Sequence, residues 1–473
     1  MAKKTQNQEN RRQMMLNEPV GRTIIKMAVP TIIAFLINSI YSLADTFFVS
    51  GLGENATAAV SVNASLDQLI MMCGSMLAVG ANSYVARLLG QGNEKKASQV
   101  LSTAFFIAMG ISLLLTVFGN LFMDQMVTLL GATPTCKEFS IDYATYVLFA
   151  APFMATSFVM NQCLRSEGSA TLSMIGMGFG GILNCLLDPI FINGWELVGI
   201  PGMGVAGASL ATMISKIVSF IILIFPYITR KSLLRLSLRY FHPSWDIISK
   251  VVSVGSSSMF RSGLAVVAGI LLNREAGNIS DGVLAGIGVS TKIMMFPFSI
   301  ILGFGTGFQP VAGFNWGAKR YDRVMDSYRF ASRVALIGGV VMGALLAIFA
   351  KPVITVFSDA EAASADMVDI GALCIRLQCL ALPIHSWVAL VNMLCAGLGN
   401  AGGALALSTS RQGSCFLPIL YPLVIFFKEY GIASVQAAAD ILSLALAIPI
   451  CLYMLRKIRR AMTAEADSDI CNA

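Results

Sequence analysis

The sequence predicts an all-α membrane protein whose twelve transmembrane helices form two pseudo-symmetric six-helix lobes. Of its 473 residues, 56% are hydrophobic and only 12% are charged, and the mean hydropathy is +0.73. A soluble globular protein carries about 25% charged residues, so most of this chain must face lipid or pack within lipid. Apolar segments of bilayer-crossing length recur about twelve times, and parts of the first half of the chain recur in the second.

The predicted transmembrane segments are poor in charge, and each is about as long as a bilayer is thick. Charged or turn-forming residues separate them. They are residues 24–49, 57–84, 98–122, 139–163, 169–192, 204–228, 250–273, 282–310, 328–350, 367–396, 402–427 and 432–455.

Basic residues predict the orientation of the chain. With the N-terminus inside the cell, most Lys and Arg residues fall on cytoplasmic ends and loops. The positive-inside rule then places both termini in the cytoplasm of a plasma membrane or inner cell membrane. Topology therefore explains the net charge of +7, and a nucleic-acid partner is not needed. The opposite loops hold only Lys137, Arg274, Lys351 and Lys428.

The sequence shows neither a targeting signal nor a cysteine framework. The first 21 residues are polar and basic, with no apolar core before a small-residue cleavage site, so we expect no secretory signal peptide. The ten cysteines are scattered and mostly lie in apolar segments, which indicates reduced core thiols and no zinc site.

Two internal matches indicate that the chain is duplicated. Residues 80–92 parallel residues 305–317, and residues 161–170 parallel residues 392–401. Because six helices is an even number, both halves insert the same way up, with a cavity between them. The expected divisions are a cytoplasmic tail (1–21), an N-lobe of six transmembrane helices (22–228), a basic cytoplasmic connector (229–247), a C-lobe of six (248–456) and a cytoplasmic tail (457–473).

One acid in the first half stands out. The apolar stretch from Gly168 to Ile192 carries a single carboxylate, Asp188, with Asn184 one helical turn before it and Pro189 directly after it. A carboxylate at a bilayer centre costs about 2.5–3.5 kcal/mol, and by default it marks a functional site. The alternative is an acid that caps or pairs locally near the helix end.

A second acid lies at a matching depth. The first predicted helix carries a polar stripe of Asn38, Tyr41, Ser42 and Asp45, at the spacing i, i+3, i+4 and i+7. At about 1.5 Å per residue, Asp45 lies about 28 Å along its helix when counted from Lys26. Asp188 lies about 30 Å along its own helix when counted from Gly168. Two acids at one depth predict a cation or proton site, since each carboxylate needs a partner in apolar surroundings.

The second half does not repeat this pair. Ile270 stands at the position of Asp45, and an apolar run at residues 417–422 replaces the region of Asp188. We therefore expect the ionisable chemistry in the N-lobe alone, with His385 isolated and unable to hold a metal. The remaining charges within the membrane are expected mostly to snorkel or to pair across helix contacts: Asp67, Asp142, Lys216, Arg261, Lys292, Arg376, Arg411 and Asp440.

The Met and Phe content suggests an adaptable substrate cavity. The chain has 25 Met and 28 Phe residues, most of them expected in the core. Flexible thioethers beside aromatic rings also suit a wall that accepts ligands of many shapes. The candidate cavity residues are Tyr41, Met259, Arg261, Met294, Met295 and Phe296.

Several motifs are weak singly but specific in their order. They are Asp45-Thr46 with Phe48-Val49, Leu164-Arg165-Ser166-Glu167-Gly168, Asn184-x-x-x-Asp188-Pro189, Gly204-Val205-x-Gly207-Ala208 with Ala211-Thr212, and Gln309-Pro310 with Asn315-Trp316-Gly317-Ala318. In this order the chain resembles the multidrug and toxic compound extrusion (MATE) family over nearly its whole length. It looks closest to the DNA-damage-inducible-F-type branch, although Ser50 stands where the family usually has Gly.

The resemblance implies a secondary active exporter, not an enzyme, that exchanges H⁺ or Na⁺ for organic and often cationic compounds by alternating access. We expect a monomer with small-molecule substrates, no nucleic-acid partner and no cofactor beyond the coupling ion. The depth count supports Asn161 less than the other residues of the implied coupling site, because Asn161 lies near the cytoplasmic end of its helix. Na⁺ coupling would use Asp45, Asp188 and Asn184. The implied coupling site consists of Asp45, Asn161, Asn184, Asp188 and Thr212.

Two other classes of protein stay open. A flippase for lipid-linked oligosaccharides has similar helices and would line its cavity with cations for a phosphorylated substrate, a role available to Arg261 and Lys292. A membrane-embedded enzyme would need a nucleophile–base pair or a set of metal ligands, and the sequence shows neither. Efflux measured under separate Na⁺ and proton gradients separates the exporter from both.

Overall fold

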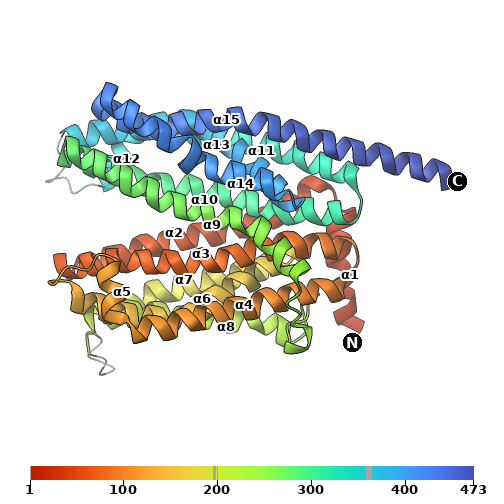
Figure 1. Ribbon diagram of the computed structural model, residues 1–473, viewed down its shortest axis with the longest axis horizontal. Helices are drawn as coiled ribbons and strands as arrows, with labels where there is room; N and C mark the ends of the chain where they lie inside the picture. The colour runs from red at the N-terminus through yellow and green to blue at the C-terminus, as the bar shows by residue number, and fades with distance from the viewer. Residues whose placement is uncertain (1, 195–198, 200, 358–364, 473) are drawn as a thin grey trace.

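The computed structural model describes residues 2–194, 199, 201–357 and 365–472, and this part of the chain is helical almost throughout (Figure 1). Within it, eleven continuous helical segments are long and apolar enough to cross a membrane. The last of them, Ala401–Glu465, is interrupted at Lys428, whose φ of 48° and ψ of −122° are not helical. The described residues therefore provide twelve transmembrane segments, as predicted.

The first six segments form one lobe and the last six form the other, so that α2–α8 and α9–α15 lie on opposite sides in Figure 1. Each predicted segment overlaps one of these helices. The N-lobe contains α2 (Val20–Ser50), α3 (Glu54–Gly90), α4 (Glu94–Leu121), the short α5 (Met123–Leu129), α6 (Lys137–Ser166), α7 (Ala170–Asn193) and α8 (Gly204–Ile228). The connector contains η2 (Leu238–Tyr240). The C-lobe contains α9 (Trp245–Ile279), α10 (Asp281–Gly317), α11 (Tyr321–Ile348), α12 (Ala350–Phe357), α13 (Ala365–Gly397), α14 (Ala401–Thr409), the π-helical turn η3 (Ser410–Ser414) and α15 (Phe416–Asn472).

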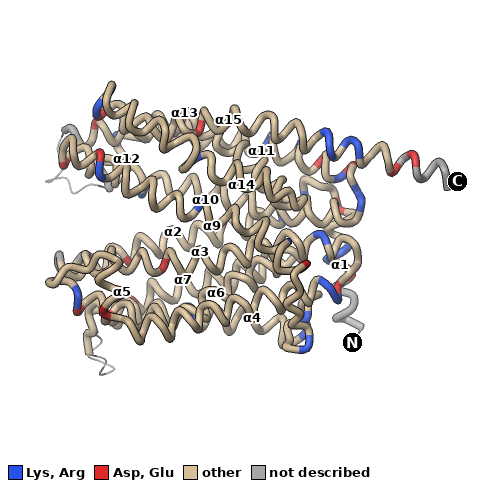
Figure 2. The backbone as a smooth tube through the Cα atoms, viewed as in Figure 1, with Lys and Arg blue, Asp and Glu red and all other residues tan. Residues whose placement is uncertain are grey.

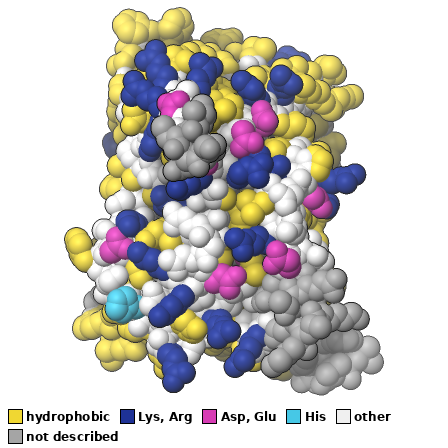
Figure 3. Space-filling model, turned by 90° about the vertical axis from the view of Figure 1, so that its right-hand side faces the viewer, with side chains coloured by type: hydrophobic (Ala, Val, Ile, Leu, Met, Phe, Trp, Pro, Cys, Tyr) yellow, Lys and Arg dark blue, Asp and Glu magenta, His cyan; other side chains and the backbone are white. Residues whose placement is uncertain are grey.

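Both chain termini lie at one end of the molecule, and Lys and Arg residues gather there (Figures 1 and 2). Figure 3 looks onto this end and shows many basic side chains across it. We call it the basic end. An open cleft at this end is lined by Arg87, Lys96, Lys250 and Lys319. This one-sided distribution follows from the same asymmetry of Lys and Arg that is visible in the sequence.

Glycines allow the two lobes to pack closely in the half of the molecule nearer the basic end. A Cβ atom on Gly255 of α9 would lie 1.8 Å from the carbonyl oxygen of Met76 on α3. A Cβ atom on Gly80 of α3 would lie 2.0 Å from the carbonyl oxygen of Val251 on α9. Because no side chain fits at such distances, only glycine allows the two backbones to approach so closely. We call these four residues the glycine seam.

Helix α1 (Ala2–Asn17) joins the two lobes at the basic end. Met15 is fully buried, and its carbonyl oxygen accepts a hydrogen bond from Asn315 Nδ2 of α10 at 3.3 Å. On the other side, Arg11 Nη1 lies 3.1 Å from Glu167 Oε1 of the N-lobe. The N-terminal segment, expected as a tail, is therefore largely a docked helix. At the other end of the chain, α15 extends as a helix through most of the expected C-terminal tail.

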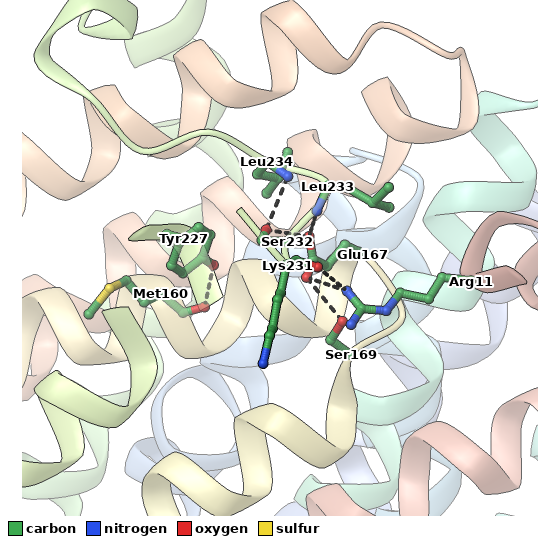
Figure 4. Close-up of polar contacts among 9 residues, drawn as sticks. All are labelled: Arg11, Met160, Glu167, Ser169, Tyr227, Lys231, Ser232, Leu233 and Leu234. Carbon is green, nitrogen blue, oxygen red and sulfur yellow. Dashed lines mark hydrogen bonds and ion pairs between the residues drawn. The ribbon is translucent and has the colours of Figure 1, made fainter. Parts of the chain in front are cut away.

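The Glu167 carboxylate is fully buried at the end of α6, and donors surround it (Figure 4). Ser169 Oγ donates to its Oε1 at 3.0 Å, and Ser232 Oγ and the backbone N–H of Leu233 donate to its Oε2 at 2.6 and 2.7 Å. Burial raises the pKa of Glu167, and the positive charge of Arg11 opposes that rise in part. This network ties α1, the turn between α6 and α7, and the connector together.

Candidate functional site

A cavity of about 450 Å³ lies between the lobes, and residues of both lobes line it. The N-lobe contributes Asp45 on α2, Asp67 on α3 and Lys216 on α8. Arg261 on α9 lines it from the C-lobe. This interlobe cavity therefore gathers charges that lie far apart in the sequence, with its acids on the N-lobe wall.

Asn184, Asp188 and Thr212 form a polar cluster between α7 and α8. Asn184 Nδ2 donates to Asp188 Oδ1 at 3.1 Å and to Thr212 Oγ1 at 3.2 Å, and Asp188 is fully buried. Helix α8 approaches this closely because Gly207 has no side chain: a Cβ there would lie 2.2 Å from the carbonyl oxygen of Phe191. The structure thus brings together three residues that the sequence named.

Four oxygen atoms in and around this cluster are buried and have no hydrogen-bond donor among the described residues. A buried acceptor without a donor is unfavourable by about 1–3 kcal/mol, so each of them needs a partner. A proton on a carboxyl group supplies one, and a small cation supplies another, because carboxylate and amide oxygens are suitable ligands for hard cations. The atoms are Asp45 Oδ1, Asp67 Oδ1, Asn184 Oδ1 and Asp188 Oδ2.

Asp67 and Lys216 join this site, although the sequence alone suggested mainly structural roles for both. Lys216 Nζ donates to Tyr41 OH at 3.4 Å and lies 4.8 Å from the centre of the Tyr41 ring. Its charge attracts both Asp45 and Asp67. Lys216 follows Thr212 by one helical turn, and this spacing is the signal that could have placed it on the same face.

Asn161 is buried but lies apart from this cluster. Its Nδ2 donates to the carbonyl oxygen of Ser173 at 3.0 Å, and none of its hydrogen bonds within the described part of the chain reaches Asp45 or Asp188. It precedes Arg165 by one turn, near the basic end of α6, where the depth count on the sequence also put it.

The cavity wall differs in part from the predicted one. Tyr41 and Arg261 line the interlobe cavity, whereas Met259, Met295 and Phe296 are absent from its lining. The prediction is wrong for Met294, which is fully buried in the C-lobe core because its side of α10 packs against other C-lobe helices. Other residues of the same two types line the interlobe cavity instead: Phe35, Met71, Met154, Phe158, Met177 and Met393.

The prediction that His385 is isolated is also wrong, whereas the expected pairing of Arg411 with Asp440 across a helix contact is confirmed. Asp440 Oδ1 accepts a hydrogen bond from Arg411 Nε at 2.8 Å, and His385 Nδ1 lies 3.5 Å from the same oxygen. These side chains come from α15, η3 and α13, so local spacing could not reveal that they meet. His385 is therefore not isolated.

Metal binding has no support beyond the cation site described above. In the described ranges, no group of three or more His, Cys, Asp or Glu side chains is placed to hold a metal ion. The cysteines described there are free thiols.

Two six-helix lobes around a cavity with buried acids define a polytopic membrane transporter. A family model described as MatE matches residues 30–190 and 258–421, so the chain belongs to this family. The two matched parts fall in the two lobes and leave out the connector.

Relatives and solved structures agree with this assignment. Multidrug export protein MepA of Staphylococcus aureus (strain MSSA476) is 25% identical over 450 residues, covering 94% of this chain and 96% of that protein. MepA of Staphylococcus saprophyticus subsp. saprophyticus is 27% identical over 447 residues, covering 92% of this chain and 94% of that protein. A crystal structure of MATE in complex with MaL6 has a TM-score of 0.88 at 24% identity, covering 96% of this chain and 99% of that chain. An outward-facing MATE family transporter of the MOP superfamily has a TM-score of 0.87 at 24% identity, covering 95% and 98%. These matches do not single out the DNA-damage-inducible-F-type branch, which stays a prediction.

Proposed function

We propose that this protein exports organic, often cationic, compounds in exchange for H⁺ or Na⁺ by alternating access. The observation that carries the proposal is a pair of carboxyl groups in the N-lobe, Asp45 and Asp188, each of which has one buried oxygen without a donor among the described residues. Asp45 lines the interlobe cavity, and Asp188 lies behind it in the cluster with Asn184 and Thr212. The multidrug export proteins that resemble this chain support the direction of transport and the class of substrate.

We assign the coupling ion to Asp45, Asp188, Asn184, Thr212 and Asn161. Asp45 and Thr212 line the interlobe cavity, and Asp188 is linked to Thr212 through Asn184. A proton would neutralise one carboxylate, and Na⁺ would be held by the oxygens of Asp45, Asp188 and Asn184. Asn161 is the weakest member of the assignment, because its amide faces Ser173 instead.

Alternating access requires two packings of the lobes. In the structure the glycine seam brings the lobes together on the side of the basic end. Pro189 lies inside α7, one residue from Asp188, and cannot donate to the carbonyl of the preceding turn, so α7 can bend there. The ion would favour one packing and the substrate the other, each by its difference in affinity for the two.

The proposal includes a plasma-membrane or inner-membrane location for a monomer with both termini in the cytoplasm. Support comes from the basic end, which carries both termini (Figure 2). Under the positive-inside rule this end faces the cytoplasm.

Efflux from proteoliposomes under separate proton and Na⁺ gradients tests the assignment. Asp45→Asn and Asp188→Asn should abolish gradient-driven efflux at matched protein amounts, because an amide can neither release a proton nor balance a cation. Partial substrate binding should survive, since the amide resembles the protonated acid. Asp124→Asn is the control, because Asp124 is an exposed N-lobe acid whose ion pair with Lys137 contributes little. Wild-type efflux with its gradient dependence intact in either mutant would remove that residue from the mechanism.

The flippase alternative has less support. It requires several cations in the cavity, and Lys292 is exposed on α10 and absent from the cavity lining. Arg261 does line the cavity, and its role is developed below.

A further inference from the structure

A second cavity lies in the C-lobe and adjoins the interlobe cavity. It measures about 240 Å³, and its lining includes Phe298, His385, Arg411 and Asp440. We call it the C-lobe pocket. The coupling scheme proposed above does not use it. The two cavities share a wall, since both are lined by Gln68, Arg261, Ser262, Leu302, Asn392 and Met393.

The charge on Asp440 in this pocket is already matched. Arg411 Nε and Nη2 donate to Asp440 Oδ1 and Oδ2 at 2.8 and 3.5 Å, and the Arg411 guanidinium carbon lies 4.1 Å from the centre of the Phe298 ring. His385 stands edge-on to the same ring, with the ring centres 5.2 Å apart. Asp440 is the only carboxylate in the described lining of the pocket. A cationic ligand therefore finds no free acid here.

Arg261 differs from Arg411 because no acid pairs with it. Within the described part of the chain, the hydrogen bond recorded for its side chain runs from Nη2 to Ser258 Oγ at 3.2 Å. A guanidinium has several further N–H donors, all directed within one plane. A cation without a counter-charge inside a membrane protein is unfavourable, and an anion in the cavity removes that penalty.

The N-lobe wall of the interlobe cavity carries acids. Asp45 and Asp67 both line it there, with Lys216 as the one cation on the N-lobe side of its described lining. The interlobe cavity therefore offers two acids beside Lys216 on its N-lobe wall and the unpaired guanidinium of Arg261 on its C-lobe wall.

We infer that Arg261, where the C-lobe pocket meets the interlobe cavity, binds the carboxylate of zwitterionic substrates whose amino group faces Asp45 and Asp67. The planar fork of Arg matches a carboxylate with two parallel hydrogen bonds, which a Lys cannot form. The inference rests on the proposed export function and deepens it, because it names a substrate class that carries both charges.

Binding of two matched dyes to the purified full-length protein in phosphatidylcholine nanodiscs tests the inference. One dye is a rhodamine methyl ester, which is a cation, and the other is the same rhodamine with a free carboxylate, which is a zwitterion at neutral pH. Fluorescence anisotropy gives the Kd of each dye for the wild type, Arg261→Gln, Arg261→Lys and Lys292→Gln. Lys292 is the matched control, because it is a C-lobe cation that is exposed and lines neither cavity.

We expect Arg261→Gln to raise the Kd of the zwitterion at least about tenfold and the Kd of the ester less than about threefold, since the charge-assisted hydrogen bonds are lost only for the carboxylate. The Kd of the zwitterion for Arg261→Lys should lie between those for the wild type and Arg261→Gln, because Lys keeps the charge and loses the planar fork. Lys292→Gln should bind both dyes as the wild type does. Retained binding of the ester shows that each variant is folded.

The inference is overturned if the wild type does not bind the zwitterion, if Arg261→Gln binds it normally, or if Arg261→Gln loses both dyes equally. Displacement of the zwitterion by phosphatidylglycerol added to the nanodisc would identify a lipid-headgroup site and would overturn it too. These measurements need no transport. The proposed function fails in a separate experiment, if export of the ester does not depend on an ion gradient.

Discussion

A single methyl group at the glycine seam should hold the lobes apart. In Gly255→Ala the new Cβ would lie 1.8 Å from the carbonyl oxygen of Met76, so α9 and α3 must separate by roughly 1.5 Å to restore an ordinary contact. Forcing a methyl group into such a packed contact costs about 1–3 kcal/mol. Under alternating access, that energy raises the ratio of molecules with the basic end open to molecules with it closed by about 5-fold to 150-fold.

Spin labels on the two lobes measure this change. Lys95 on α4 and Arg320 before α11 are exposed at the basic end, and the distance between labels at these positions reports the separation of the lobes. Double electron–electron resonance in a cysteine-free background should show a longer distance in Gly255→Ala, with slower efflux. Gly110→Ala and Gly338→Ala are matched controls, since a Cβ on either helical glycine has no heavy atom within 4 Å. A wild-type distance distribution together with wild-type efflux in Gly255→Ala would refute the reasoning.

Three further predictions concern the docking of α1, the wall of the interlobe cavity and the topology of the chain. Arg11 of docked α1 lowers the pKa of Glu167. With Glu167 still buried against Ser232 and Leu233 when α1 undocks, loss of the Arg11 charge raises that pKa further, so the docked state binds fewer protons than the undocked state. Docking should therefore weaken as the pH falls, starting above the ordinary glutamate range because burial raises the pKa of Glu167. The protection factors of the α1 amides, which are exchange rates relative to the intrinsic rate at each pH, should fall with pH in the wild type and lose this dependence in Glu167→Gln. Protection factors that are independent of pH in the wild type would contradict the prediction. Met71→Gln puts an amide on the wall of the interlobe cavity and should change the relative export of different drugs more than their total. Met295→Gln, outside that wall, is the control, and a proportional loss for every drug in Met71→Gln would indicate a structural role. An impermeant maleimide applied to intact cells should label Thr135→Cys and spare Arg235→Cys, both exposed positions, and the reverse pattern would overturn the topology.

Much of the fold follows from properties that lie along the chain itself. Twelve apolar segments predict twelve crossings by helices, because a helix pairs the backbone N–H and C=O groups within each segment and unpaired groups are too unfavourable in lipid. The asymmetry of Lys and Arg likewise predicts the gathering of basic side chains at one end. Within one helix, spacing is geometry: Asn184 and Asp188, four residues apart, do share a face and a hydrogen bond.

Contacts between helices were decided only by tertiary packing. Arg411, Asp440 and His385 meet although they lie on separate helical elements, and Lys216 comes to the acids of α2 and α3 from α8. Met294 faces the C-lobe core while Met71, the same residue type in a similarly apolar helix, faces the cavity. The physical reason is that hydropathy determines that a segment is a helix in lipid but hardly constrains its rotation about its own axis. That rotation depends on close approaches such as those at Gly80 and Gly255, where the atoms that meet belong to distant parts of the chain.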